Sequence, residues 1–204
     1  MSVKVIFATG NEGKLNEIRD ILSDADIDMM SSKQAGLSTD VEENGTTFAE
    51  NALIKARAAA KNADCMVLAD DSGLEVDYLN KEPGIYSARY MGENTSYDIK
   101  NQSILDRLTG VEGEARSARF VCSIAAVLPD GSEYTVEATI EGQIADKISG
   151  NHGFGFDPIF YVPELGCTTA DIPETEKNKI SHRGKALKKL EALLIEKGVW
   201  SVKS

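Results

Sequence analysis

The amino-acid sequence predicts an α/β fold in which helices flank a mixed, twisted sheet, with two lobes and a ligand-binding active-site cleft between the lobes. In the first 70 residues, apolar strand-like runs alternate with segments of helical periodicity, which is the pattern of parallel strands connected by helices. From residue 115 to residue 144 the pattern becomes strand-like on both sides of a Pro129-Asp130-Gly131 turn, which is typical of a hairpin. A sheet with both kinds of strand pairing and a hairpin-rich second lobe follows from these patterns.

The first strand is expected at residues 3–9, an apolar and β-branched run that leads into a glycine-containing loop. A helix comes next, with apolar residues at helical spacing: Leu15, Ile18, Ile21 and Leu22. A second helix is expected from Thr47, because Thr47 and Glu50 have the spacing of a capping box. Its inward face carries mostly small side chains, which indicate close packing on a sheet: Phe48, Ala52, Ala56, Ala59 and Ala60.

Residues 65–69 are almost wholly apolar and predict a buried central strand, which we expect to end abruptly at the polar residues 70–73. A further helix is expected at 96–108, and two hairpin strands at 120–128 and 133–140. The last helix is expected at about 181–197, with Gly198 as its stop. Leucines make up its expected buried face: Leu187, Leu190, Leu193 and Leu194.

The composition predicts a single globular domain over residues 1–204, with two lobes and no separable linker. The chain shows no apolar run near the ~20 residues of a membrane helix and no secretory signal at its start, so we expect a cytoplasmic protein without a membrane partner. Three scattered cysteines and two histidines argue against disulfides and a His-rich zinc site. A net charge of −11 argues against a nucleic-acid polymer as partner, whereas a small phosphorylated ligand needs only a local basic cluster and a cation.

The loop after the first strand is a candidate phosphate site. Thr9-Gly10-Asn11-Glu12-Gly13-Lys14 joins a strand to a helix, where glycines let the backbone approach a ligand and the helix start offers N–H groups to an anion. Its spacing is not that of a Walker loop, because two residues separate the glycines and Leu15 follows the lysine. The alternative is an ordinary turn with a solvated lysine.

Two acidic segments are candidates for a metal site. Glu42-Glu43-Asn44-Gly45 precedes the Thr47 helix, and Asp70-Asp71-Ser72-Gly73 follows the buried strand. Two neighbouring carboxylates beside an apolar strand are costly unless a cation or a helix end compensates them. Oxygen ligands of this kind favour Mg²⁺, which uses one or two carboxylates together with phosphate and water. A capping turn at Asp70 and a solvated loop at Glu42 are the alternatives.

The last polar region combines aromatic rings with cations. Gly153-Phe154-Gly155-Phe156-Asp157-Pro158 places two aromatic residues among glycines, which suits stacking on a base, and the alternative is a tight turn that plugs the core. Lys177 and Ser181-His182-Arg183-Gly184 place cations at the opening of the last helix. Because helix starts favour acids, these basic residues predict an external anion or base acceptor, with a solvated helix start as the alternative.

Together these segments supply a phosphate loop, metal carboxylates, a base platform and cations, as a nucleotide phosphohydrolase requires. The chain resembles the inosine triphosphate pyrophosphatase family, the XTP/dITP diphosphatases, and its bacterial branch in particular. The resemblance covers essentially the whole length and rests on six segments in family order: residues 9–14, 42–52, 69–73, 83–89 (Pro83-Gly84-Ile85-Tyr86-Ser87-Ala88-Arg89), 153–158 and 181–184.

The resemblance implies hydrolysis of dITP, ITP and XTP between the α- and β-phosphates, with Mg²⁺ as cofactor, in an elongated fold that forms a homodimer. It implies that Asp71 is the catalytic proton acceptor and a Mg²⁺ ligand, with Glu42 as second carboxylate and Glu43 as the alternative to Glu42. It implies these substrate contacts: Thr9, Gly10, Asn11, Glu12, Gly13, Lys14, Ser72, Phe154, Gly155, Phe156, Asp157, Lys177, His182 and Arg183. Phe156 stands where many bacterial members have tyrosine, so stacking is kept and the hydroxyl is lost.

The implied mechanism is attack by a water that the metal activates and Asp71 orients or deprotonates. We expect His182 and Arg183 to donate to the 6-oxo group of the base, so that adenine is rejected because these donors would be left unpaired. Three rivals are kept: a nucleotide-binding module without hydrolysis, a Rossmann oxidoreductase, and a related pyrophosphatase for modified pyrimidines. The missing dinucleotide loop argues against the oxidoreductase.

Overall fold

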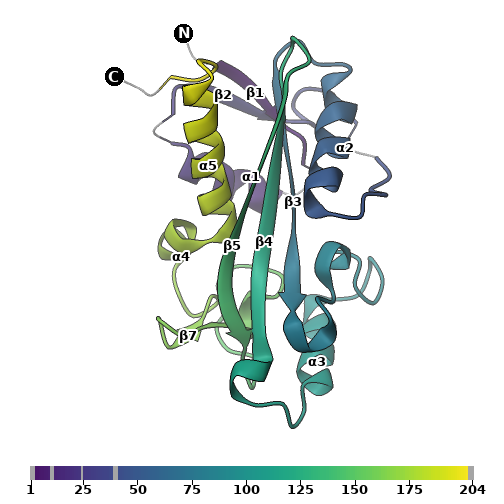
Figure 1. The fold of residues 1–204 in the computed structure, drawn as a ribbon, viewed down its shortest axis with the longest axis vertical. Helices are drawn as coiled ribbons and strands as arrows, with labels where there is room; N and C mark the ends of the chain where they lie inside the picture. Colours follow the sequence, from purple (N-terminus) through teal and green to yellow (C-terminus); the bar gives the residue numbers. More distant parts are fainter. Residues whose placement is uncertain (1–2, 10–11, 24, 39–40, 202–204) are drawn as a thin grey trace. The chain divides into compact units, whose positions relative to one another are not determined.

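The computed structural model describes residues 3–9, 12–23, 25–38 and 41–201. They form helices and strands that alternate as far as the helix Tyr97–Arg107, after which four strands precede the last two helices (Figure 1). The strands are β1 (Val3–Phe7), β2 (Ile27–Ser31), β3 (Met66–Val76), β4 (Ser117–Val127), β5 (Glu133–Ile144), β6 (Phe160–Val162) and β7 (Cys167–Thr168). The helices are α1 (Glu12–Ile21), α2 (Phe48–Ala60), α3 (Tyr97–Arg107), α4 (Glu174–Ile180) and α5 (His182–Glu196). Short 3₁₀ turns cover Asp77–Leu79, Gly84–Tyr86, Gly113–Arg116 and Asp157–Ile159.

The strands form one mixed sheet, as predicted. Their order is β2-β1-β3-β4-β5-β6-β7. β1 pairs in parallel with β2 and with β3, whereas β6 pairs antiparallel with β5 and with β7. Within the described part of the chain, no helix has the length and apolar character needed to cross a membrane.

The chain divides into two compact units, each described here by itself. Unit 1 consists of Met1–Asp71, Cys122–Ala138 and Arg183–Ser204, and unit 2 of Ser72–Val121 and Thr139–His182. The strands β3, β4 and β5 and the helix α5 each contribute residues to both units. The expectation of a single domain over residues 1–204 stays a prediction, as does the expected cleft.

Unit 1 has helices on both faces of its strands, because apolar residues of the strands alternate between the two faces. In β1 and β3, Val5, Phe7, Met66 and Leu68 pack in one buried cluster with α1 and α5. Their neighbours in sequence pack in a second cluster with α2: Ile6, Val67 and Ala69. Figure 1 shows α1 and α5 on one side of these strands and α2 on the other. The small residues Ala52, Ala56 and Ala59 allow α2 to lie close to the sheet.

Unit 2 has a core of its own. Leu74 and Val76 of β3 pack with Ile104 and Leu108 of the α3 region and with several aromatic rings. The ring of Phe120 contacts two others, with its centroid 4.3 Å from that of Phe160 and 5.0 Å from that of His182. The first half of β4 and the start of α5 are therefore held together by the Phe120–His182 ring contact.

Most predicted elements are confirmed, and the predicted end of the central strand is wrong. The strand β3 continues through the acidic residues to Val76, because Leu74 and Val76 are apolar and buried. Thr47 caps α2 as predicted, accepting a hydrogen bond from the Glu50 backbone N–H at 3.1 Å. The carboxylate of Glu50 accepts from the backbone N–H of Thr46 at 2.6 Å, one residue earlier than the capping box expected. The elements β2, β6, β7 and α4 were not predicted.

Candidate active site

Asp70 and Asp71 lie inside β3, and their side chains point to opposite faces of the strand. Asp70 follows the alternation of Met66 and Leu68, on the face covered by α1 and α5, whereas Asp71 continues the α2 face. Both are buried, with 2% and 8% of their surface exposed. The two carboxylates therefore differ in their partners, and each has a compensating cation, Lys14 for Asp70 and Lys55 for Asp71.

Asp70 forms ion pairs with two cations from flanking helices. Its Oδ2 accepts from Lys14 Nζ of α1 at 2.9 Å and from Arg183 Nε of α5 at 3.4 Å. Burial alone would raise the pKa of Asp70, but the charges of Lys14, Arg183 and Lys55 outweigh it and hold this pKa below the ordinary value of 3.8. Asp70 therefore stays charged and takes part in an ion-pair network.

Arg183 has internal partners for its charge. The residue is 1% exposed, and its guanidinium donates to Glu17 Oε2 as well as to Asp70. Burial opposes its charge, but the neighbouring carboxylates of Glu17 and Asp70 raise the pKa of Arg183 above its usual value. The argument that a basic helix start needs an acceptor from outside the protein is therefore wrong for Arg183, because the protein's own Glu17 and Asp70 accept its hydrogen bonds. Its contact with substrate stays a prediction.

Asp71 lies among polar residues of α2. Its Oδ2 accepts from Asn51 Nδ2 at 3.1 Å, and its Oδ1 from Lys55 Nζ at 3.4 Å. Burial raises the pKa of Asp71 above 3.8, opposed by the charge of Lys55 and reinforced by that of Glu43. A carboxylate with a raised pKa and a nearby cation suits proton transfer better than the neutralised Asp70 does.

The acidic loop before α2 reaches this group through Glu43. Lys55 Nζ lies 3.3 Å from Glu43 Oε2, so one ammonium bridges Glu43 and Asp71. Glu43 is half-buried, whereas Glu42 is exposed. Burial lowers the pKa of Lys55, but Asp71, Asp70 and Glu43 raise it above the usual value, so a cation is favoured at this point. The arrangement favours Glu43 over Glu42 as the partner of Asp71.

The expected phosphate loop is described in part. Gly10 and Asn11 lie outside the described residues, and the helix α1 begins at Glu12 and continues through Gly13. Thr9 follows β1 and is half-buried, and Lys14 faces Asp70. Ser72 continues β3 after Asp71 and is half-buried. Lys14 of α1 thus lies on the face of β3 that carries Asp70, opposite the face that carries Asp71.

Unit 2 holds the loop of residues 153–158 around a buried ion pair. Asp157 Oδ2 accepts from Lys177 Nζ at 2.6 Å and from the backbone N–H of Phe154 at 2.8 Å. Its Oδ1 accepts from Thr169 Oγ1 at 2.8 Å. Gly153 has a φ of +73°, and a Cβ there would clash with the Asp157 carboxylate. The loop therefore needs glycine at this position.

The two aromatic residues of this loop differ in exposure. Phe154 is 42% exposed, with Lys177 Nζ 4.9 Å from its ring centroid. Phe156 is only 4% exposed and meets the Tyr97 ring edge-on at 5.3 Å. Phe156 is thus a core residue, in line with the alternative of a tight turn that plugs the core, and its contact with a base stays a prediction. Asn101 Nδ2 of α3 holds the loop by donating to the Gly155 carbonyl at 3.1 Å.

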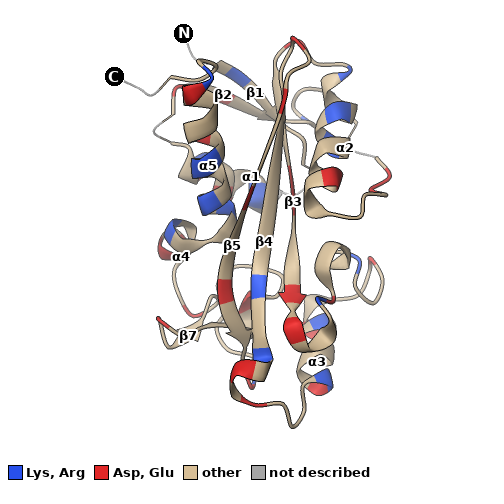
Figure 2. Ribbon diagram, in the orientation of Figure 1, with Lys and Arg blue, Asp and Glu red and all other residues tan. Residues whose placement is uncertain are grey.

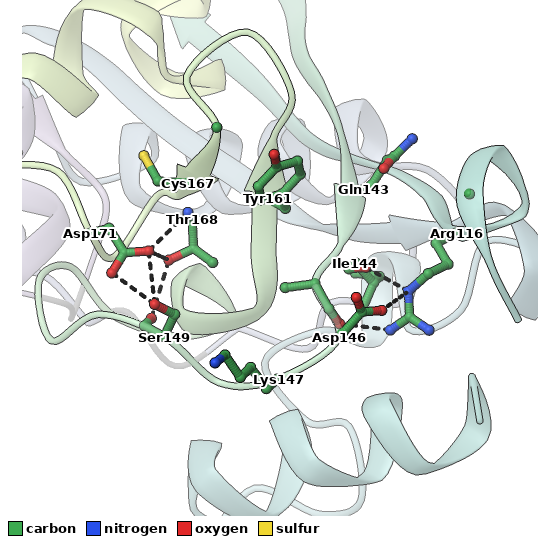
Figure 3. Close-up of a pocket in the computed structure, with 13 residues that line it drawn as sticks. Arg116, Gln143, Ile144, Asp146, Lys147, Ser149, Tyr161, Cys167, Thr168 and Asp171 are labelled. Carbon is green, nitrogen blue, oxygen red and sulfur yellow. Dashed lines mark hydrogen bonds and ion pairs between the residues drawn. The ribbon is translucent and has the colours of Figure 1, made fainter. Parts of the chain in front are cut away.

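A separate pocket of about 490 Å³ opens in unit 2, shown in Figure 3. Several of its polar side chains bind each other or the backbone: Ser149 and Thr168 donate to Asp171, and Arg116 donates to the Ile144 and Ala145 carbonyls. The residues lining it differ from the predicted site residues. These polar groups shape the chain around the pocket, and we assign it no role in the reaction.

Three polar residues around the acidic pair were not predicted as site residues. Glu17, Asn51 and Lys55 lie on helices, where single polar residues are usually solvated. Glu17 stands one turn after Lys14, and Asn51 and Lys55 are four residues apart, hence on the same face of α2. A spacing of three or four residues, which places two polar side chains on one helix face, is the signal that could have identified them. Figure 2 shows basic residues along α5, in agreement with a cationic helix start.

A metal centre built by protein groups alone is not present in the described ranges, where no cluster of three or more His, Cys, Asp and Glu side chains could hold an ion. Asp71 and Glu43 nevertheless form an oxygen pair that already binds a cation, the ammonium of Lys55. Such a pair fits Mg²⁺, which takes its remaining ligands from phosphate and water.

Comparisons with known proteins agree along nearly the whole chain. A model of the Ham1 family matches residues 5–193. A dITP/XTP pyrophosphatase of Clostridium perfringens is 46% identical over 194 residues, covering 92% of this chain and 95% of that protein. A dITP/XTP pyrophosphatase of Bacillus subtilis is 47% identical over 191 residues, covering 94% and 96%. The structure of a HAM1 protein from Coxiella burnetii aligns with a TM-score of 0.86 at 41% identity, covering 95% of this chain and 99% of that one.

Proposed function

The chain belongs to the Ham1 family, and on this premise we propose that it is a nucleoside-triphosphate pyrophosphatase that hydrolyses dITP, XTP and ITP. The products are the nucleoside monophosphate and pyrophosphate. Its relatives named dITP/XTP pyrophosphatase are 44–48% identical to it over nearly their whole length. The observation that carries the chemistry is the Asp71 carboxylate, buried beside Lys55 and separated from the neutralised Asp70 by the strand itself.

We propose that Asp71 is the proton acceptor for the attacking water. Its raised pKa makes it a stronger base than an ordinary aspartate. The ammonium of Lys55 at Oδ1 favours the charged form of Asp71 and also pairs with Glu43. The water oxygen then forms a bond to phosphorus, the anhydride bond between the α- and β-phosphates breaks, and the proton goes to Asp71.

We propose that the reaction uses Mg²⁺, held by Asp71 and Glu43 rather than by Glu42. This choice follows from the oxygen pair that Lys55 bridges and from the exposure of Glu42. When bound, Mg²⁺ neutralises phosphate charge and lowers the pKa of a coordinated water.

The remaining expected contacts stay proposals. Lys14 and the loop of residues 9–13 would bind the triphosphate. Ser72, the residue after Asp71, would also contact the substrate. Phe154 would stack on the base, with Lys177 and His182 as donors and Asp157 holding Lys177 in place. Arg183 would contact the substrate from beside Asp70, and its hydrogen bonds to Glu17 and Asp70 limit how far its guanidinium can move toward the substrate.

A direct assay tests the proposal. Purified protein is incubated with dITP and Mg²⁺, and pyrophosphate and dIMP are measured, with dATP, dGTP and a modified pyrimidine triphosphate as comparison substrates. Release of pyrophosphate from dITP well above that from dATP supports the proposal. Binding of dITP without release of pyrophosphate would instead establish a nucleotide-binding module without hydrolysis. A preference for the modified pyrimidine triphosphate would establish a pyrophosphatase for modified pyrimidines.

We further propose that the protein is a cytoplasmic homodimer with no nucleic-acid polymer as partner. Exposed apolar side chains of unit 2 support self-association: Tyr86, Met91 and Ile99 are each more than half exposed. Light scattering coupled to gel filtration should give twice the chain mass, and a monomer at working concentrations would contradict this.

A further inference from the structure

Asn51 is a fully buried polar side chain that bridges the acidic loop and Asp71. It lies in the first turn of α2 with 0% of its surface exposed. Its Oδ1 accepts from the Gly45 backbone N–H at 2.9 Å, and its Nδ2 donates to Asp71 Oδ2 at 3.1 Å. One amide therefore connects the segment that carries Glu43 to the central strand.

The chemistry of the neighbours determines which way this amide points. A backbone N–H can only donate, so the carbonyl end of Asn51 must face Gly45. The amino end must then face Asp71, whose Oδ2 is held as an acceptor. The orientation of Asn51 does not depend on distinguishing nitrogen from oxygen, which is the usual difficulty with asparagine.

We infer that Asn51 is a positioning residue that assigns different tasks to the two oxygens of Asp71. Asn51 occupies Oδ2 and leaves Oδ1, the oxygen beside Lys55, to face the metal site and the attacking water. Through Gly45, the same amide keeps Glu43 beside Lys55. This inference rests on the proposed function of Asp71 and adds a residue to it.

Gly45 has the shape that this arrangement needs. A Cβ at residue 45 would lie 2.6 Å from Asn51 Oδ1 and 2.8 Å from the Cβ of Glu50. A side chain at residue 45 would thus push the Asn51 amide away from its position. Gly45→Ala therefore perturbs the orientation of Asn51 while leaving the Asn51 and Asp71 side chains chemically intact.

The principal test is Asn51→Asp. An aspartate has the same shape and still accepts from Gly45, but it replaces the N–H donor with an oxygen facing Asp71 Oδ2. We expect kcat for dITP to fall at least about tenfold with KM within about threefold, because one tenfold step corresponds to ~1.4 kcal/mol in the barrier. We also expect Mn²⁺ affinity, measured by electron paramagnetic resonance without nucleotide, to change at least about threefold. In free energy, a threefold change is about half of a tenfold step. Asn62→Asp, the same change at an exposed residue past α2, should alter neither quantity.

The outcomes separate this inference from the proposed function. If wild-type protein releases no pyrophosphate from dITP, the function itself fails. If wild type is active, Asp71→Asn is inactive, and folded Asn51→Asp keeps kcat and Mn²⁺ affinity, only the role of Asn51 is overturned. Gly45→Ala should reproduce the selective loss of kcat, and normal kinetics in folded Gly45→Ala would also count against the inference.

A measurement on the wild type covers the case in which both variants fail to fold. The side-chain amide of Asn51, assigned by nuclear magnetic resonance, should give two well-separated and exchange-protected proton signals. Adding Mg²⁺ should shift these signals more than those of the exposed Asn62. Rapid exchange or indifference to Mg²⁺ would overturn the inference without any variant.

Discussion

The two adjacent aspartates of β3 have different environments because a strand turns successive side chains to opposite faces. Asp70 neutralises Lys14 and Arg183, whereas Asp71 lies beside Asn51 and Lys55. We therefore expect matched Asp→Asn changes at the two positions to affect different properties, since the first removes an ion-pair partner and the second removes a base.

Asp71→Asn should reduce turnover of dITP far more than tenfold, since more than ~1.4 kcal/mol of barrier is at stake, while the fold is kept. The physical reason is the loss of both the proton acceptor and one metal charge. Steady-state pyrophosphate release and circular dichroism measure the two properties. Turnover within about tenfold of wild type would reject Asp71 as the base.

Asp70→Asn should instead destabilise the protein by about 3–5 kcal/mol, the usual cost of removing one member of a buried ion pair. Lys14 and Arg183 would then keep their charges with one carboxylate fewer. Urea unfolding at pH 7 measures the loss, with Asp71→Asn as the neighbouring control. A midpoint equal to that of wild type would show that the network adds nothing.

The effect of Asp70 should depend on pH in a defined direction. Because its folded pKa lies below the ordinary 3.8, its contribution is present above that ordinary value and is lost as pH falls through the folded pKa. The stability difference between wild type and Asp70→Asn should thus be constant from pH 7 to about pH 5 and shrink below pH 4. Unfolding at a series of pH values checks this, and a difference that grows on acidification would contradict it.

At the scale of an element, the loop of residues 153–158 depends on a glycine. Gly153→Ala should break the Lys177–Asp157 pair, because a Cβ would clash with Asp157. Gly110→Ala is a matched control, since Gly110 also has a positive φ but an open surrounding within 4 Å. We expect the control to cost about 1–2 kcal/mol and Gly153→Ala to cost more. KM for dITP should rise only for Gly153→Ala, and equal losses for both would reject the role of this pair.

How far the sequence predicts these elements depends on how local their causes are. The helix α2 is predictable because Thr47 and Glu50 cap it within one turn. The length of β3 is not, because Asp70 and Asp71 are stabilised by Lys14, Arg183 and Lys55, which lie far away in sequence. The same reason explains Phe154 and Phe156, which look equivalent in a glycine-rich loop until Tyr97 of α3 covers one of them. Sequence motifs predict which segments form the candidate site. Tertiary contacts determine which side chains of a segment are buried and which face the site.

At the scale of the whole molecule, β3, β4, β5 and α5 each contribute residues to both units. We therefore expect one cooperative unfolding transition, because melting unit 2 alone would cut three strands in the middle. Trp200, the only tryptophan of the chain and a buried residue of unit 1, reports on that unit by fluorescence. Far-ultraviolet circular dichroism reports on both units. Two separated midpoints would show that the units are independent domains.

The alternation along β3 also constrains how such a protein can change over generations. Deleting or inserting one residue between Met66 and Asp70 would exchange the faces of the two acids, so that the base would meet Lys14 and Arg183 and the ion-pair partner would meet Lys55. Substitutions can accumulate one at a time in this strand, but a single-codon gain or loss changes the parity of every position after it. We expect length variation among descendants of this gene to be confined to the connections, with the count of residues from Met66 to Asp71 preserved.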